Sequence, residues 1–460
     1  MSIGRRARQW ASPERCVAIA CGFFVGLVVL VLRWYVRDGA QPLFWNDSAD
    51  YVAAAKLSLL SPERLLGIRP VFMPLVLGVL DGNQQQLTIV HSVFSAISWG
   101  LLGAVLTVSL RTWPARAVAI GGVITIASVW TVSMWDQQIL TESLALSSLA
   151  LVVSAALWFA NSPSLLRSCF LAGSALLWLL NRDSHAIPIA AGALVVGITV
   201  WVAKTTNRRL IALTCAYLVA FAFVISASAS TSNRNLQPLE HVFAVRVLPY
   251  PDRVQWFTDQ GMPLGAELLA IPEATDPVKD LAGFTPVPPE PKWEPWRDWL
   301  ETHGQLALFR YMATHPTYLW TETQQVPERV FNNGTGLTTY WPLQQRSIPV
   351  IDELGTISTT ATILIASAAL VVIAYLDEHR RRSAIVAMVV IATALPHGVA
   401  VWHLDGMESA RHMLIASIQL RIGTMILVAT AVDSLFALRG TGRFRLARSN
   451  DLQMAPHPRE

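Results

Sequence analysis

Residues 16–35 read CVAIACGFFVGLVVLVLRWY, an almost uninterrupted apolar run. A helix of about 20 mostly apolar residues is long enough to cross the hydrocarbon core of a bilayer. Arginines precede the run, as they do in a secretory signal, but Arg33, Trp34 and Tyr35 end it where small residues would mark a cleavage site. We therefore predict an uncleaved first membrane span.

Other apolar runs of similar length follow along the chain. Of its 460 residues, 53% are hydrophobic and 14% are charged, whereas a soluble domain has about 25% charged residues. The net charge of +4 is small, so we expect no binding to nucleic acid. We predict an all-α polytopic membrane protein with about ten transmembrane helices and a partly helical extracytoplasmic insertion. The expected spans are 16–35, 87–110, 117–135, 140–160, 165–181, 186–203, 210–229, 357–376, 384–402 and 412–436.

Basic residues are distributed unevenly between the loops. With a cytoplasmic N-terminus, every even-numbered span ends beside basic residues, in agreement with the positive-inside rule. We therefore predict a multi-pass protein of the inner or plasma membrane with both termini in the cytoplasm. The basic residues that favour this orientation are Arg111, Arg116, Arg167, Lys204, Arg208, Arg209, Arg380, Arg381, Arg382, Arg439, Arg443, Arg445 and Arg448. The exceptions surround the first outer loop and are Arg33, Arg37, Lys56, Arg64 and Arg69.

The predicted organisation has four parts. Residues 1–230 form an N-terminal transmembrane module, and 37–86 are its first outer loop. Residues 231–356 form an extracytoplasmic domain, 357–436 the last transmembrane helices, and 437–460 a cytoplasmic tail. This division follows the change from long apolar runs to a polar, proline-rich stretch and back again.

Two shorter segments have more than one interpretation. Trp293, Trp296 and Trp299 are spaced three residues apart and share one helical face. They belong either to a helix at the membrane interface or to the core of a small domain. Segment 69–80 is apolar but short and contains prolines, which favours an interfacial or re-entrant position.

The four cysteines lie in or beside apolar runs and predict neither a disulfide framework nor a metal site.

Residues 45–51 read WNDSADY and follow the first predicted span. Carboxylates beside a bilayer are costly and usually functional. One interpretation is structural: Asp47 caps a short helix and Asp50 lies near its third position, where a negative charge is favourable. The other is catalytic, because an ionised carboxylate within reach of a hydroxyl can accept its proton. The two interpretations are compatible.

Further ionisable residues fall on the same predicted outer face. Arginines in short outer loops run against the positive-inside trend, and an anionic ligand would explain them. The structural alternatives are headgroup contacts for Arg69, a helix-dipole interaction for Glu142, and arginine–aspartate pairs within the later loops. Our candidate substrate- or phosphate-binding residues are Arg69, Glu142, Arg182, His185, Arg411 and His412.

No sequence motif for a nucleotide, a dinucleotide or a catalytic metal is present. The histidines have no recognised metal-ligand spacing, so we predict no dedicated metal site. We predict no cofactor, although a divalent cation stays an open possibility.

Four motifs together resemble a known pattern. An acidic motif follows the first span, and Arg69-Pro70 precedes the second. Residues 140–144 read LTESL at the start of a later span, and 310–319 read RYMATHPTYL in the large outer loop. In this order they resemble polytopic glycosyltransferases of the GT-C superfamily, especially bacterial enzymes that use polyprenyl-phosphate sugars. The resemblance covers most of the first eight spans.

The resemblance implies a GT-C-like fold and a catalytic base in the first outer loop, which carries over to Asp47 or Asp50. We favour Asp47, although the family often has adjacent Asp-Glu where this chain has Asp-Ser-Ala-Asp. The outer arginines carry over as phosphate ligands. Arg411 is the weakest of these assignments, since no proline accompanies it.

The implied reaction is an inverting sugar transfer on the extracytoplasmic face. The donor would be a polyprenyl phosphate carrying a sugar, and the acceptor a glycan, lipid or protein of the cell envelope. One alternative is a polysaccharide polymerase or ligase that uses lipid-pyrophosphate oligosaccharides. Another is a non-enzymatic transporter of lipids or solutes, which would more often carry polar groups at mid-membrane.

Overall fold

The computed structural model describes residues 13–440 except 38, 40, 59–60, 203–206, 271–292, 326–345, 377–380 and 405–408. The predicted tail after 440 and the basic residues Lys204 and Arg380 lie outside the described residues. The described part is built from helices, with a single isolated bridge between Leu43 and Gln138. This agrees with the predicted all-α class.

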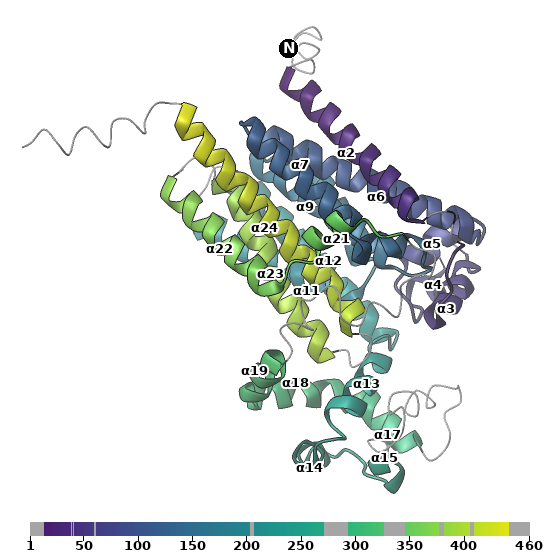
Figure 1. The fold of residues 1–460 in the computed structure, drawn as a ribbon. Helices are drawn as coiled ribbons and strands as arrows, with labels where there is room; N and C mark the ends of the chain where they lie inside the picture. The colour runs from purple at the N-terminus through teal and green to yellow at the C-terminus, as the bar shows by residue number, and fades with distance from the viewer. Residues whose placement is uncertain are drawn as a thin grey trace, which may run out of the picture.

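Seven described helices are long and apolar enough to cross a membrane. Most of them run side by side in one bundle (Figure 1). These seven are α2 (Pro13–Arg37), α6 (Gln84–Ser109), α9 (Glu142–Asn161), α11 (Ala186–Val202), α12 (Arg208–Thr231), α23 (Arg381–Leu404) and α24 (Ser409–Gly440).

The other three predicted spans are shorter or bent. Helix α10 (Leu165–Leu179) is apolar but has only 15 residues. Helix α7 (Trp113–Ser128) continues into α8 (Trp130–Ser133) after a bend of 56°. Helix α21 (Pro349–Gly355) meets α22 (Thr359–Leu376) at 71°. In the described part of the chain, length and composition therefore support seven spans, or up to nine if each bent pair counts as one.

The bend after α7 corrects the prediction of a continuous helix over 117–135. Val129 has an extended ψ of 142°, which interrupts the helix. The carboxylate of Asp352, in α21, accepts a hydrogen bond from the backbone N–H of Trp130 at 2.9 Å. A distant acidic side chain thus satisfies a free amide at the new helix start.

Close packing of glycines fixes the first helix against the bundle. A Cβ on Gly22 would lie 2.9 Å from the carbonyl oxygen of Gly100 in α6, and a Cβ on Gly100 would lie 2.8 Å from that of Gly22. Only residues without a side chain allow the two backbones this approach, a common arrangement in membrane bundles. The opposite side of α2 exposes Phe23 and Val31, as expected for contact with lipid.

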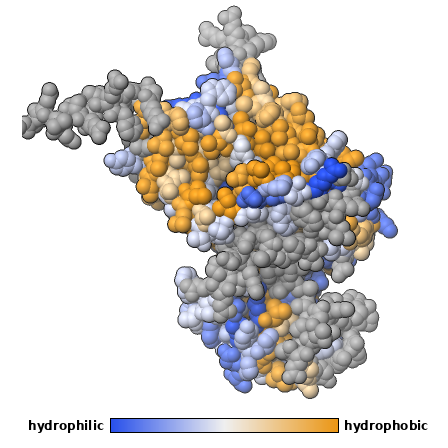
Figure 2. All heavy atoms as spheres, viewed as in Figure 1, coloured by the Kyte–Doolittle hydropathy of each residue, from blue (hydrophilic) through white to orange (hydrophobic). Residues whose placement is uncertain are grey.

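The surface of the bundle is mainly hydrophobic, and hydrophilic residues gather toward the insertion (Figure 2). The insertion lies beyond one end of the bundle, and α2 begins and α24 ends at the other end (Figure 1). We call these two ends the insertion face and the terminal face. A bundle with apolar exposed sides and polar ends is the arrangement of a membrane protein.

Short helices form the insertion. Trp296 is 3% exposed, and Trp293 and Trp299 are also buried in a core with Phe243 and Phe257. The tryptophan stripe is therefore a domain core, and its interpretation as an interfacial helix was wrong. The helices are α13 (Leu236–Arg246), α14 (Pro251–Asp259), α15 (Ala266–Ala270), α17 (Glu294–Trp299), a π-helical turn (Leu300–Gly304), α18 (Gln305–Thr314) and α19 (Pro316–Gln325).

The first outer loop also folds into short helices at the insertion face: α3 (Asn46–Ala55), α4 (Pro62–Leu65) and α5 (Phe72–Val79). Met73 and Leu77 of α5 are fully buried, so the apolar segment 69–80 packs into the protein on one side. Two of the exceptional arginines have structural partners nearby. Buried Arg64 donates to the carbonyls of residues 55 and 57, and Arg33 pairs with buried Asp136.

Candidate active site

Helix α3 holds the two aspartates of the first outer loop, and a serine attaches it to the bundle. The hydroxyl of Ser48 accepts from the backbone N–H of Trp45 at 2.9 Å and donates to the carbonyl of Ile139 at 3.0 Å. Trp45 is the N-cap, so Asp47 is the second helical residue and Asp50 the fifth. The predicted capping role of Asp47 was therefore wrong, and its side chain is used elsewhere.

Asp47 lies between two arginines from distant parts of the chain. Its Oδ1 accepts from Arg69 at 2.8 Å, and its Oδ2 accepts from both terminal nitrogens of Arg411 at 3.1 Å. Asp50 accepts two hydrogen bonds from Arg69, at 2.7 and 3.0 Å. The Arg69 guanidinium also lies over the ring of Tyr51, 5.7 Å from its centroid. These contacts fix the position of Arg69 from three sides.

Glu142 is fully buried at the start of α9 and binds two further guanidiniums. Its Oε1 accepts from Arg411 Nε at 2.6 Å and from Arg182. A continuous network therefore runs from Asp50 through Arg69, Asp47, Arg411 and Glu142 to Arg182.

The expected arginine–aspartate pair within the loop after α10 does not form. Arg182 binds Glu142, and its neighbour Asp183 accepts from Arg234 at 3.0 and 3.1 Å. Arg234 follows the seventh predicted span on the outer side, so it also runs against the positive-inside trend. That signal was available in the sequence, but Arg234 was not among the predicted site residues.

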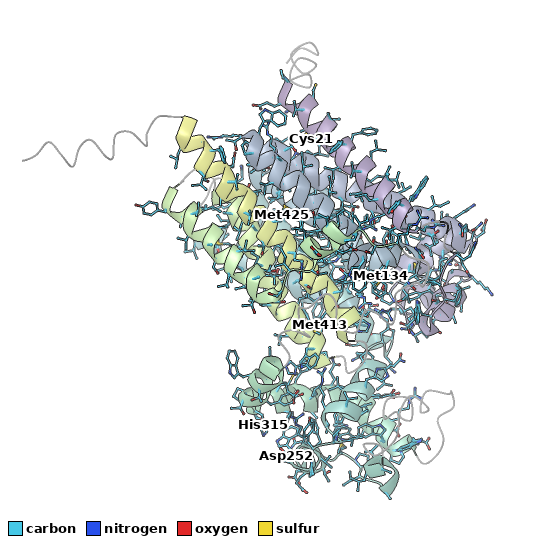
Figure 3. The ribbon with its side chains drawn as sticks, viewed as in Figure 1. Cys21, Met134, Asp252, His315, Met413 and Met425 are labelled. Atoms are coloured by element: carbon cyan, nitrogen blue, oxygen red, sulfur yellow. The ribbon has the colours of Figure 1, made fainter. Side chains whose placement is uncertain are left out.

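A cavity of about 450 Å³ opens beside this network, between the bundle and the insertion. A volume of this size is in the usual range of about 300–1,000 Å³ for sites that bind small molecules. Met413, labelled in Figure 3, marks the end of α24 that reaches the site, two residues beyond Arg411. The polar lining of the cavity includes Asp47, Arg69, Arg182, Asp183, Arg234, Asn235, Gln305, Arg411 and His412.

The cavity wall carries more positive than negative charge. Four arginines line it against two aspartates, whereas Glu142 and Asp50 do not line it. Burial raises the pKa of the Asp47 carboxyl, but the guanidiniums of Arg411 and Arg69 outweigh burial and hold that pKa below its ordinary value of 3.8. Asp47 is therefore ionised at neutral pH. The wall is suited to an anion, with one ionised carboxylate among the cations.

The predicted site residues are not all in the cavity wall. Asp47, Arg69, Arg182, Arg411 and His412 line it together, from four separate segments. Glu142 is buried behind the wall and Asp50 is partly exposed outside it, and both contact its arginines.

His185 lies elsewhere. Its ring stacks on Trp178 with centroids 4.4 Å apart, and the ring of His397 is 5.7 Å away. The Nδ1 of His185 is 2.6 Å from the Trp178 carbonyl oxygen. A fully buried ring in this aromatic cluster has no access to the cavity, so its placement argues against the predicted role in phosphate binding.

A second buried network lies directly beneath the site. Asp136 accepts from Arg33, from Ser92 at 2.9 Å and from Ser143 at 2.6 Å. Ser143 is next to Glu142 in α9, so this network fixes the helix start that carries the glutamate. From the sequence, Arg33 stood out only as one of the exceptions to the positive-inside rule.

Among the described residues, no group of three or more histidine, cysteine or acidic side chains is arranged to hold a metal ion.

Comparison with known proteins gives matches among solved structures. No protein-family model and no curated protein sequence matches the chain. The structure is similar to that of the archaeal oligosaccharyltransferase AglB from Archaeoglobus fulgidus, solved in complex with an inhibitory peptide and a dolichol-phosphate. The TM-score is 0.44 at 11% sequence identity, over 96% of this chain and 52% of AglB. The chain thus spans about half the length of that protein.

Proposed function

We propose that this protein is a membrane glycosyltransferase of the GT-C type that transfers a sugar from a polyprenyl-phosphate donor with inversion. The observation that carries the proposal is the position of Asp47, an ionised carboxylate in a cavity wall rich in arginine. The motif order in the sequence supports the same reaction. The donor's lipid chain would stay in the bilayer, and its phosphate would enter the cavity at the insertion face.

In the proposed reaction, an acceptor hydroxyl attacks the anomeric carbon of the donor sugar and its proton passes to Asp47. The bond between that carbon and the phosphate oxygen breaks, and polyprenyl phosphate leaves with the electron pair. General-base assistance of this kind contributes about 10²- to 10⁴-fold in rate. Arginines stabilise the departing phosphate through charge-assisted hydrogen bonds.

A carboxylate bound by two arginines is a weak base, so donor binding would have to change its surroundings. The donor phosphate is a competing partner for Arg69 and Arg411, since guanidinium binds phosphate and carboxylate in the same geometry. When these arginines turn toward the phosphate, Asp47 loses the contacts that depress its pKa. The base would then become stronger only when the donor is present.

The two acidic residues that do not line the cavity, Asp50 and Glu142, would have positioning roles. Asp50 holds Arg69, and buried Glu142 holds both Arg411 and Arg182. Arg69 and Arg411 would therefore keep their places when they exchange Asp47 for phosphate. The insertion contributes Asn235 and Gln305 to the same cavity, and Asn235 donates to Gln305 at 2.6 Å. The side of the cavity formed by the insertion would bind the acceptor, which would be a glycan, lipid or protein of the cell envelope.

The test combines cells and purified protein. A deletion strain is compared with its complemented parent by glycan analysis of the envelope, and we expect loss of one defined sugar. Purified protein is then given radiolabelled polyprenyl-phosphate monosaccharides, with oligosaccharide pyrophosphate donors in parallel. Transfer only from the monophosphate donors supports the proposal. Transfer only from the pyrophosphate donors would make the protein a polymerase or ligase, and movement of lipid without a new glycosidic bond would make it a transporter.

A further inference from the structure

A second candidate site lies on the terminal face, away from the candidate active site. It combines an apolar cavity of about 560 Å³ within the bundle and a polar pocket of about 510 Å³ at its end. The two share one lining residue, Arg382 at the start of α23. The apolar cavity shares no lining residue with the cavity that contains Asp47.

The apolar cavity has the depth of one membrane leaflet. Helix α9 lines it from Leu149 to Ala160, α12 from its N-cap Asn207 to Leu218, and α23 from Arg382 to Thr393. Each stretch advances eleven residues, or about 16 Å at 1.5 Å per residue. This is close to half of the roughly 30 Å hydrocarbon thickness of a bilayer. The wall is formed mainly by aliphatic and aromatic side chains.

The polar pocket at the end is basic. Arg111, Arg116 and Arg382 line it, and among the described residues none of the three forms an ion pair. Arg382 donates one hydrogen bond, to the backbone carbonyl of Asn161 at 2.8 Å, and Arg116 Nε donates to the carbonyl of Leu110 at 3.0 Å. Each guanidinium has five N–H donors, so each keeps donors for a ligand.

The acidic residues of the pocket offset only part of this charge, because three arginines line it against two carboxylates. The carboxylate of Asp433 is fully buried and accepts from the backbone N–H groups of Arg111 and Thr112 at 2.7 to 3.1 Å. These hydrogen bonds hold the loop between α6 and α7. Glu14 is exposed at the edge of the pocket. Three guanidiniums thus line a pocket that shares Arg382 with an apolar cavity.

We propose that this site binds an anionic diacyl phospholipid of the leaflet at the terminal face. The phosphate lies among Arg382, Arg111 and Arg116, and an acyl chain fills the cavity between α9, α12 and α23. Basic pockets between transmembrane helices are known to bind anionic headgroups. The position of the charge excludes the sugar donor as the occupant, because that donor's phosphate would lie at the opposite face.

Lipid binding to purified full-length protein, followed by native mass spectrometry, tests this proposal. We expect one phosphatidylglycerol to bind in preference to phosphatidylcholine, and R382Q and R111Q each to weaken that binding by roughly fivefold. Both arginines are exposed, so these variants are expected to fold. A156F places a ring in the apolar cavity and should abolish the bound lipid.

Two matched variants serve as controls. Arg209→Gln removes an exposed arginine that lines neither cavity, and Ala117→Phe adds a ring on the exposed side of α7. Both should bind phosphatidylglycerol as the unmodified protein does. The proposal would be overturned if folded R382Q and R111Q bound phosphatidylglycerol as tightly as the unmodified protein does. It would also be overturned if the unmodified protein did not prefer phosphatidylglycerol to phosphatidylcholine. Displacement of phosphatidylglycerol by an equal amount of polyprenyl phosphate, or its full displacement by inorganic phosphate, would overturn it as well.

Discussion

Asp47 and Arg411 are 364 positions apart in the sequence, yet Asp47 Oδ2 accepts hydrogen bonds from both terminal nitrogens of Arg411. This pair joins the first outer loop to the last helix of the bundle. Its two members differ in exposure, because the aspartate side chain is 24% exposed and the arginine 3%. The accessible member is suited to chemistry, and the buried one to fixing its position.

Asp47→Asn should lower turnover by about 10²- to 10⁴-fold, since an amide cannot accept the acceptor's proton. Protein stability should change little, because Arg411 keeps its contact with Glu142. The matched variant is Asp50→Asn, which touches Arg69 but does not line the cavity, and its loss should be much smaller. Turnover is measured with donor and acceptor at saturation. Near-normal turnover of both folded variants would show that neither aspartate is the base.

Glu142→Gln should destabilise the protein strongly. Removing one charge from a buried ion pair leaves the other uncompensated, at a cost of about 3–5 kcal/mol. Here two guanidiniums, of Arg182 and Arg411, lose their shared partner. Thermal unfolding in detergent measures the effect. Glu301→Gln is the control, because it breaks only a partly exposed i,i+4 pair with Arg297 and should change stability by about 0.5 kcal/mol or less. Equal unfolding temperatures for the two variants would contradict the central role of Glu142.

The pH dependence of turnover should differ between the free enzyme and its donor complex. In the free enzyme, arginines hold the pKa of Asp47 below 3.8. The base therefore stays ionised until the pH falls to this lowered pKa. The acid limb of kcat/KM should therefore lie below the ordinary aspartate range. If the donor phosphate draws the arginines away, the acid limb of kcat should lie at higher pH. Coincident acid limbs would argue against the proposed exchange of partners.

Glu240 should make the insertion less stable at neutral than at acidic pH. Burial raises its pKa from 4.5 to about 7, a shift that Arg297 opposes and Glu301 supports. The folded state therefore holds a proton that the unfolded state releases, and stability falls as pH rises from about 4.5 to 7. Glu240→Gln should remove this dependence and gain stability above pH 7, by an amount up to about 3 kcal/mol.

Chemical unfolding followed by tryptophan fluorescence at pH 5 and pH 8 measures this effect, since Trp296 and Trp299 lie in the insertion's core. The difference between Glu240→Gln and the unmodified protein should be larger at pH 8. A difference that is the same at both pH values would mean that Glu240 titrates normally in the folded state.

Several features of the fold follow from the sequence because they depend on local composition. The runs around α2, α6 and α12 are apolar over a bilayer's thickness, whatever they pack against. The break of the helix before Pro316 is also local, because proline lacks an N–H and restricts the residue before it. In contrast, the bend at Val129 depends on Asp352, more than 200 residues away, and no local pattern announces it.

In the candidate site, too, some features could be predicted from local sequence and others depend on tertiary contacts. Charged residues beside apolar spans stand out in the sequence, because placing them there is costly. Asp47, Arg69, Arg182 and Arg411 were found in this way. Their separate roles depend on which charge faces which, and the sequence does not contain that information. His185 has the same sequence signal as His412, yet only His412 lines the cavity.

By itself, the sequence determined the helical class, most of the spans and the group of outer charged residues, because hydrophobic length and the cost of burying charge are local properties. Only the tertiary structure decided which of these residues contact one another. It placed Asp47 between Arg69 and Arg411, put Glu142 behind the wall, and buried the tryptophans in a domain core. These outcomes depend on contacts between residues far apart in the chain, which helix packing creates and local sequence patterns do not specify.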